Sequence, residues 1–514
     1  MASAGRQSFL RREISQLPLF LLVFGVLCAS MMVPAMHALV VNDHSTSQAF
    51  FYAGALGCVI FAMIGIAHAG RAPRHGALGP LMSLLSAFVI MPAVLAIPFV
   101  EALPTTRFVN AYFEMFSAFT TTGATLFDDP ARLSGTLHLW RAQVGWLGGL
   151  LMWTAAVAIL APLNLGGFEV TTQAEPGRSE TAPHASRALT PRQRVGRAVT
   201  TLAPLYAALT LALWMLLIFS GQVPLDALIH AMSVMATSGI TGTDPAVPSA
   251  AGIPGEMIMA LFMCFALSRL TFSSDTVTAT QGGLTTDPEF RIGLGIVILV
   301  PLALFARHWF ASLDAENPEP LVTALKALWG GMFTVLSFLS TTGFVSGHWT
   351  EAQSWSGLGT PGLILMGLSL IGGGVATTAG GVKLLRVFAL YRNAVREMEQ
   401  LVHPHSVSGA GVAGRRLQSG GAFIAWIFFM LFALSFTAVV LALALIGVSF
   451  EDAMVMAIAM LSTTGPLTQV ASEAPIDLIA LSDTAKAVLC TAMVLGRLET
   501  LAIIALLTPD LWRA

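Results

Sequence analysis

Long apolar stretches separated by short polar ones cover most of the chain. A membrane-spanning helix needs about 20 predominantly apolar residues, and ten stretches come close to that length or exceed it. They are residues 17–40, 50–69, 79–100, 137–163, 199–220, 252–271, 291–311, 357–371 with its continuation, 421–447 and 484–507. The pattern predicts an all-α protein that crosses a membrane many times.

Shorter apolar runs lie between some of these spans, at 110–121, 226–237, 323–341 (mixed in polarity) and 452–463. Apolar runs of roughly 10–14 residues are too short to cross a bilayer and are typical of re-entrant segments. Asn110, Asp226 and Asp452 stand near the starts of three runs, where N-caps are expected. We therefore predict short helices that enter the membrane and turn back.

Each short run ends in two hydroxyl residues followed by a glycine. The four endings read FTTTGATLF, MATSGITG, LSTTGFVSG and LSTTGPLTQ, around Gly123, Gly239, Gly343 and Gly465. These glycines are 116, 104 and 122 residues apart. The period predicts four pseudo-repeats, each made of a span, a short helix, a turn and a second span.

The turns are candidate cation ligands. Non-helical backbone inside a membrane persists only where it is buried in protein or lines a water-filled path. If the four turns meet on one axis, their carbonyl oxygens can replace the hydration shell of a cation, and four helix C-termini add negative potential. The alternative is close helix packing through small residues, which explains one copy more readily than four. The predicted ligands are Thr121, Thr122, Gly123, Thr237, Ser238, Gly239, Thr341, Thr342, Gly343, Thr463, Thr464 and Gly465.

Composition excludes several classes of protein. The chain has 514 residues, 55% hydrophobic and 11% charged, and a mean hydropathy of +0.76, whereas soluble proteins carry about 25% charged residues. Membrane lipid is therefore an expected partner. A net charge of −2 without a basic stripe gives no sign of a nucleic-acid partner. No HExxH, GxSxG or ATP-binding motif is present, so an enzyme is not expected.

The distribution of lysine and arginine predicts the orientation. With the N-terminus in the cytoplasm, 19 of these residues fall on the inner side and 5 on the outer side, as the positive-inside rule requires. All four short runs then lie on the outer side. The polar stretch 171–198, rich in Arg, Pro, Ser and Thr, is expected to be a cytoplasmic loop.

Four motifs of the chain carry a resemblance to a known family. They are TTTGAT at 120–125, WLGGLLMWTAAVAILAPLNLGG at 146–167, IGGGVATTAGGVKLLRV at 371–387 and LGRLETLAIIALLTPDLWR at 495–513. In this order they resemble the first filter segment, the helix that follows it, the Gly-rich intramembrane loop and the final helix of the TrkH/KtrB superfamily of potassium uptake proteins, most closely its TrkH branch. The likeness covers nearly the whole chain, in order.

The resemblance implies four non-identical repeats around one pore that takes up potassium (K⁺) through a filter on the outer side. It also implies a homodimer in the bacterial inner membrane, controlled by a cytoplasmic TrkA-type nucleotide-binding ring. The implied organisation is two N-terminal transmembrane helices (1–78), repeat 1 (79–170), the cytoplasmic loop (171–198), repeat 2 (199–280), repeat 3 with the gating loop (281–400) and repeat 4 (401–514).

Two filter segments depart from the family pattern. The second reads TSGI, where the family often has an aromatic residue after the glycine, and the fourth reads TTGP, where an Asn before the glycine is frequent. In the related plant transporters, a serine at the first glycine position is associated with sodium selectivity. Gly123 therefore favours potassium.

Residues 371–381 interrupt an apolar span with five glycines, each of which costs a helix about 1 kcal/mol relative to alanine. The resemblance favours an unwound loop that gates the pore, and the alternative is a tightly packed helix kink. The candidate gate residues are Gly372, Gly373, Gly374, Thr377, Thr378, Gly380, Gly381 and Lys383.

Arg497 stands within an otherwise apolar span, where a charge is costly unless it faces a wet cavity or a partner. One interpretation projects the side chain below the filter, where its charge lowers cation occupancy. The alternative ties it to the carbonyls of a neighbouring pore helix.

A secondary active cation symporter, coupled to Na⁺ or H⁺, is the alternative function. Such a protein needs an acid or histidine at mid-membrane that changes its protonation. The predicted spans contain few acids, which favours a passive pore with external gating.

Overall fold

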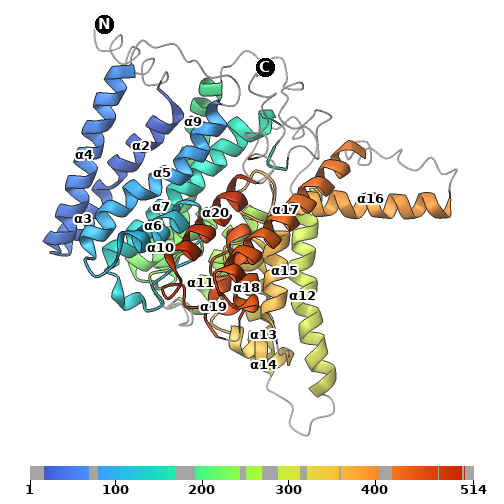
Figure 1. Cartoon of the computed structure of the whole chain (residues 1–514). Coiled ribbons are helices and arrows are strands. Elements are labelled where there is room, and N and C mark those ends of the chain that lie inside the picture. The colour runs from blue at the N-terminus through green and yellow to red at the C-terminus, as the bar shows by residue number, and fades with distance from the viewer. Residues whose placement is uncertain are drawn as a thin grey trace.

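The computed structural model describes residues 17–68, 79–163, 165–167, 191–243, 251–268, 287–312, 321–357, 360–403, 419–472, 474–499 and 503. All regular elements within these ranges are helices (Figure 1). Of the predicted loop 171–198, residues 171–190 lie outside the described part, and residues 191–198 already belong to a helix.

Three helices precede the first predicted repeat. α2 (Leu19–Ser30) and α3 (Met32–Val40) follow each other closely and pack against α4 (His44–His68). Both α2 and α4 also contact α5 (Gly79–Ala102), the first helix of repeat 1. α2 and α3 together make one candidate span of 22 residues, and α4 makes a second of 25 residues.

The remaining helices form four units of similar order. Repeat 1 consists of α5, α6 (Phe108–Phe119) and α7 (Gly135–Ala155), and repeat 2 of α9 (Pro191–Phe219), α10 (Pro224–Ala236) and α11 (Gly252–Met263). Repeat 3 consists of α12 (Pro288–Ser312), α13 (Leu321–Leu339), α14 (Trp349–Ser356) and α15 (Gly362–Ile371), followed by α16 (Leu384–Val402), which projects away from the other helices (Figure 1). Repeat 4 consists of α17 (Ser419–Leu445), α18 (Phe450–Leu461), the short α19 (Leu467–Val470) and α20 (Asp483–Leu498).

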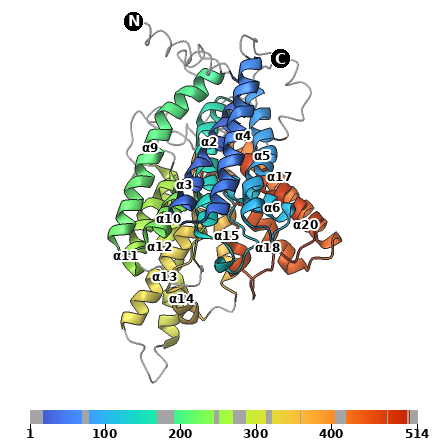
Figure 2. The ribbon, with the colours of Figure 1, turned by 90° about the vertical axis from the view of Figure 1, so that its left-hand side faces the viewer.

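Contacts between units follow the order of the chain and close on themselves. The helix that follows the predicted turn in each unit packs against the helix that precedes the turn in the next: α7 against α10, α11 against α13, α15 against α18, and α20 against α6. Figure 2 gives a second view of these helices, turned by 90°. The ends of α6, α10, α13 and α18 are therefore enclosed by the other helices.

Eight helices of the described residues are long and apolar enough to span a membrane, compared with ten stretches predicted. The stretches 252–271 and 357–371 contain helices of 12 and 10 residues, because a 3₁₀ turn at Cys264–Leu267 and the glycines after Ile371 end them. α20 has 16 residues and ends before Glu499, whose φ is +63°. In the opposite direction, the run 323–341 belongs to a 19-residue helix, α13, rather than a half-length one. Hydropathy measures side chains and does not detect where a backbone stops being helical.

The predicted N-caps are wrong by three residues. The N-caps of α6, α10 and α18 are Arg107, Val223 and Ser449, so Asn110, Asp226 and Asp452 each occupy the third helical position. In α18 the hydroxyl of Ser449 accepts from the Asp452 backbone N–H (3.1 Å) and donates to its carboxylate (2.7 Å). The Ser449 side chain thus caps α18, but Asp452 accepts from the Ser449 hydroxyl and not from the Ser449 backbone N–H, as it would in a capping box.

Candidate functional site

The helices α6, α10, α13 and α18 end in the same turn. In each, a threonine adopts left-handed backbone geometry, and its N–H donates to the carbonyl three residues earlier. The next residue donates to the carbonyl five residues earlier over 2.8–3.0 Å. These are the two hydrogen bonds of a Schellman motif, which normally has glycine at the left-handed position. The four threonines are Thr121 (φ 55°), Thr237 (50°), Thr341 (57°) and Thr463 (53°).

Left-handed geometry is unusual for a β-branched residue and costs about 1–3 kcal/mol at each position. The fold imposes it four times, at equivalent places in all four units. Strain of this kind persists where the surrounding structure holds it, often at functional sites. The four units therefore share the backbone geometry of the turn as well as its sequence pattern.

The turns lie against one another in a ring. A methyl group added to Gly123 would lie 1.7 Å from the carbonyl oxygen of Ser238, and one added to Gly239 would lie 2.2 Å from that of Thr342. At Gly343 it would lie 2.7 Å from the Pro466 ring, and at Gly465 it would lie 2.0 Å from the backbone nitrogen of Ala124. Each turn thus touches the next, and the fourth touches the first.

The predicted ligand residues are brought together and enclosed. All twelve are buried except Gly123, which is half-buried. The hydroxyls of Thr121 and Thr463 are buried without a hydrogen-bond partner. Unpaired oxygens at the base of the turns are available to a desolvated cation, since burying a polar group without a partner is otherwise costly.

The fourth turn differs from the other three. The Gly465 N–H donates to the carbonyl of Thr122 in repeat 1 (2.6 Å), whereas the N–H of Gly123 and of Gly343 points back to its own helix. Pro466, which follows directly, lies against both Gly343 and Gly239. Repeat 2 stands opposite repeat 4 in the circle of four turns. Because Pro466 of repeat 4 reaches Gly239 of repeat 2, its side chain extends toward the centre of that circle.

A cavity, called the vestibule below, adjoins the turns. Gly123, Gly239, Gly343 and Pro466 are among the residues that line it. Charged and titratable side chains also line it, namely Asp128, His138, Arg141, His230 and Glu256. Burial raises the pKa of the Asp128 carboxyl, and the neighbouring Asp477 and Glu114 add to the shift.

Glu114 does not face the vestibule. It is buried, pairs with Arg141 (2.6 Å) and accepts from the backbone N–H of Leu126 (3.0 Å), three residues after Gly123. It therefore braces the first turn from behind and is not an ion ligand. His230, at the equivalent position of repeat 2, lies near Gln222 and Thr241, at 3.4 and 3.3 Å.

The Gly-rich segment is non-helical from Gly372 to Lys383, as predicted, and it lies directly against the turns. The N–H of Gly380 donates to the hydroxyl of Thr341 (2.7 Å), and a methyl group on Gly380 would lie 2.1 Å from the carbonyl of Ser462. The Thr378 hydroxyl donates to the carbonyl of Met235 (3.3 Å). The segment, called the loop below, therefore contacts repeats 2, 3 and 4 and is more than a kink in a continuous helix.

Three buried cations donate to backbone carbonyls of the loop. Arg497 donates to Thr378 (2.6 Å), Arg386 to Val382 (3.2 Å) and Lys383 to Ala379. Arg497 is thus bonded to a backbone carbonyl, as in the second interpretation of the sequence. That carbonyl belongs to the loop, however, and not to a neighbouring pore helix. Arg386 also pairs with Glu499 (2.5 Å), although the two residues are 113 positions apart in the sequence.

Sequence reasoning missed two acids that contact these segments. Glu289 of α12 accepts from the N–H of Val375 in the loop (3.1 Å). Glu256 of α11 accepts from Ser346 and Gly347 beside the third turn. A lone acid within a predicted span is itself a signal of function, and Glu256 lies inside the predicted span 252–271.

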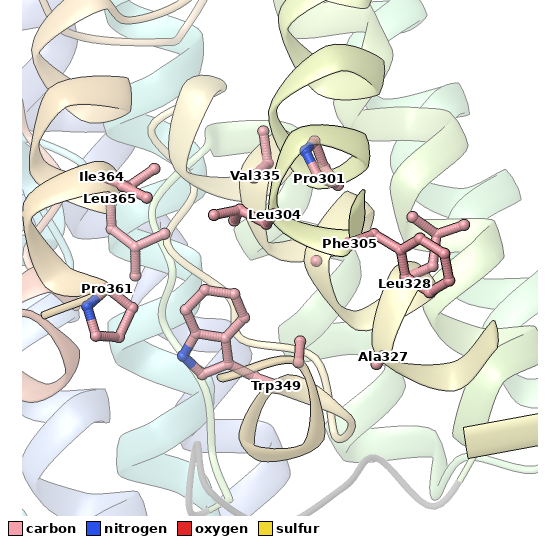
Figure 3. A pocket seen from close by; sticks show the side chains of 12 residues that line it. Pro301, Leu304, Phe305, Ala327, Leu328, Val335, Trp349, Pro361, Ile364 and Leu365 are labelled. Atoms are coloured by element: carbon pink, nitrogen blue, oxygen red, sulfur yellow. The ribbon is translucent and has the colours of Figure 1, made fainter. Parts of the chain in front are cut away.

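Other candidates do not form sites. An apolar pocket between α12, α13, α14 and α15 is lined by side chains such as Leu304, Phe305 and Trp349 (Figure 3), which do not suit a bare cation. Among the described residues, no three His, Cys, Asp or Glu side chains gather as metal ligands.

Comparison with known proteins identifies the family. The TrkH family profile, described as cation transport protein, matches residues 326–511. The chain is 31% identical over 411 residues to the Trk system potassium uptake protein TrkH of Halomonas elongata, covering 79% of each chain. It belongs to the TrkH family. Its identity to TrkH of Salmonella typhimurium is 28% over 491 residues, covering 94% of this chain and 96% of the relative.

The TrkH fold is also found in a solved structure. The crystal structure of the potassium transporter TrkH from Vibrio parahaemolyticus matches with a TM-score of 0.79 and 25% identity, covering 97% of this chain and 99% of that one. The chain is therefore an all-helical, multi-pass membrane protein of the TrkH type, and it is not an enzyme.

Proposed function

We propose that this TrkH-family protein takes up potassium ions through a pore at the centre of its four units. The observation that carries the proposal is the ring of four Schellman turns, whose residues face one another over short distances. Four helix C-termini directed at one point favour a cation, and clustered carbonyl oxygens can replace its water. The relatives named above are potassium uptake proteins.

In this proposal, the residues around Gly123, Gly239, Gly343 and Gly465 form the selectivity filter, and the vestibule is its outer entrance. The loop closes the path below the filter, because Gly380 already touches the bases of the third and fourth turns. Arg497 holds it there through a hydrogen bond to the Thr378 carbonyl, and the bond from Lys383 to the Ala379 carbonyl stabilises the loop internally. The protein acts as a homodimer in the bacterial inner membrane, with the N-terminus in the cytoplasm and a nucleotide-binding ring acting on the loop.

Transport measurements on purified protein test this function. The protein in liposomes should take up ⁸⁶Rb⁺, a potassium analogue, with inhibition by K⁺ and much weaker inhibition by Na⁺. Uptake should not require a proton or sodium gradient. Uptake that depends on such a gradient would favour a coupled symporter, and the absence of any Rb⁺ or K⁺ flux would contradict the proposal.

A further inference from the structure

Glu256 links two repeats at the edge of the vestibule. It lies in the first half of α11 of repeat 2, and only 5% of the residue is exposed. Within the described part of the chain, its side-chain partners belong to repeat 3: the indole N–H of Trp329 (2.8 Å), the hydroxyl of Ser346 (2.9 and 3.0 Å to the two carboxylate oxygens) and the N–H of Gly347 (2.8 Å). The contact therefore crosses from one unit to the next.

The hydrogen bonds fit an ionised carboxylate. Trp329 and Gly347 can only donate, and the Ser346 oxygen already accepts from the N–H of His348 (3.2 Å), so its proton is directed to Glu256. An ionised carboxylate has only acceptor positions and satisfies all three donors. A protonated carboxyl group would carry an O–H of its own, which would face one of these three donors.

No lysine, arginine or histidine among the described residues pairs with Glu256. Glu114, the acid behind the first turn, has Arg141 at 2.6 Å. Burying a carboxylate without a counter-charge is costly, and an ionisable residue retained inside a membrane protein is by default a candidate for function. Because Glu256 lines the vestibule, its negative charge acts where cations would enter.

The segment held by Glu256 is the continuation of the third turn. Ser346 and Gly347 stand three and four residues after Gly343, and Leu126, held by Glu114, stands three residues after Gly123. The N–H of Ser346, which is equivalent to that of Leu126, donates to the Thr334 hydroxyl of its own repeat (3.3 Å), so Glu256 adds its contacts beside that bond. Repeats 1 and 3 face each other across the ring. The position of Glu114 is occupied in repeat 4 by Met456, which cannot accept in this way. Two opposite filter segments are thus braced by carboxylates.

We propose that Glu256 is a positioning residue for the third filter segment. Its carboxylate fixes residues 343–347 opposite the first segment and adds negative potential at the entrance, so that it sets both the affinity for K⁺ and the preference for K⁺ over Na⁺. This inference rests on the proposed function as a potassium pore.

Two substitutions at Glu256 and one matched control test the proposal. Glu256→Gln keeps the size of the side chain but removes its charge. It also places the amide NH₂ of glutamine, a hydrogen-bond donor, against groups that themselves donate. Glu256→Asp keeps the charge on a shorter side chain. Glu351→Gln makes the same chemical change four residues beyond Gly347, at a partly exposed carboxylate that pairs with His348 (3.1 Å) and with no other described residue.

The measurements are the KM of ⁸⁶Rb⁺ uptake and the ratio of K⁺ to Na⁺ inhibition, normalised to folded protein. Losing a charged hydrogen-bond acceptor should raise KM about tenfold in Glu256→Gln and lower the K⁺ to Na⁺ preference by a similar factor. Glu256→Asp should recover part of both, and Glu351→Gln should match the unmodified protein.

The proposal is overturned if Glu256→Gln leaves KM and the ion preference unchanged, including the case in which only the maximal rate falls. If Glu256→Gln does not fold, Glu256→Asp decides: a lowered ion preference supports the proposal and an unchanged one overturns it. Failure of the proposed function itself is distinguishable, because the unmodified protein would then show no K⁺-sensitive uptake.

Discussion

Replacing Arg497 with glutamine should release the loop from α20. The Arg497 guanidinium is buried, with 4% of the residue exposed, and its hydrogen bond to the Thr378 carbonyl measures 2.6 Å. Glutamine is shorter and uncharged, so the bond is lost or becomes a neutral one. If the loop closes the pore, the substitution favours the open form.

The size of the effect follows from the type of bond. A hydrogen bond that involves a charged group contributes about 1.5–3 kcal/mol. Removing it from the closed form alone shifts the equilibrium between closed and open pores by roughly 10- to 150-fold. A protein whose pore is mostly closed without its regulator should therefore show a rise in flux of at least about tenfold.

The assay is ⁸⁶Rb⁺ flux into liposomes that contain the purified protein alone. Lys486→Gln is the matched control, because Lys486 is also a buried cation of α20 but bonds Asn110 (2.9 Å) and the Ile479 carbonyl (3.0 Å), away from the loop. Flux per folded protein should rise in R497Q and stay unchanged in K486Q. Equal flux in R497Q, K486Q and the unmodified protein would refute the idea that Arg497 holds the loop closed.

Three further predictions concern other parts of the molecule. Gly123→Ser should lower the K⁺ to Na⁺ preference in competition assays, because a side chain at φ +73° would overlap the Ser238 carbonyl; an unchanged preference would count against the filter assignment. Because burial raises the pKa of Asp128, this carboxyl loses its charge at a higher external pH than an ordinary aspartate. The KM for K⁺ should therefore rise as external pH falls toward that pKa, and Asp128→Asn should show a raised KM without this pH dependence. Glu499→Gln should destabilise the protein by about 3–5 kcal/mol in unfolding measurements, since it breaks the buried pair with Arg386; a loss below about 1 kcal/mol would contradict a structural role for this pair.

The features that sequence predicted best are local ones. Short apolar runs and the repeated hydroxyl–hydroxyl–glycine pattern depend on neighbouring residues, so the four turns were correctly placed at the ends of α6, α10, α13 and α18. The interruption after Ile371 is also local, because its glycines cannot sustain a helix. The helix starts were less well predicted, since the N-caps of α6 and α10 are Arg107 and Val223, which rarely serve as caps.

Features that depend on distant contacts were not predictable in the same way. Arg497 was recognised as costly within a span, but its partner Thr378 lies 119 residues away. Left-handed geometry at Thr121 and its three equivalents contradicts the usual preference of threonine and follows from tertiary packing. Glu256 carried a sequence signal as a lone acid within a predicted span, but its partners Ser346 and Gly347 belong to the next repeat and are brought to it only by the fold.

Anomalous diffraction from crystals soaked in Rb⁺ or Tl⁺ tests the central claim most directly, because it locates bound cations without reference to transport. The account predicts one or more peaks among the turns around Gly123, Gly239, Gly343 and Gly465, within coordination distance of main-chain oxygens from several repeats. Peaks found only elsewhere, or a centre in which these oxygens stay bonded to protein groups and bind no cation, would contradict it.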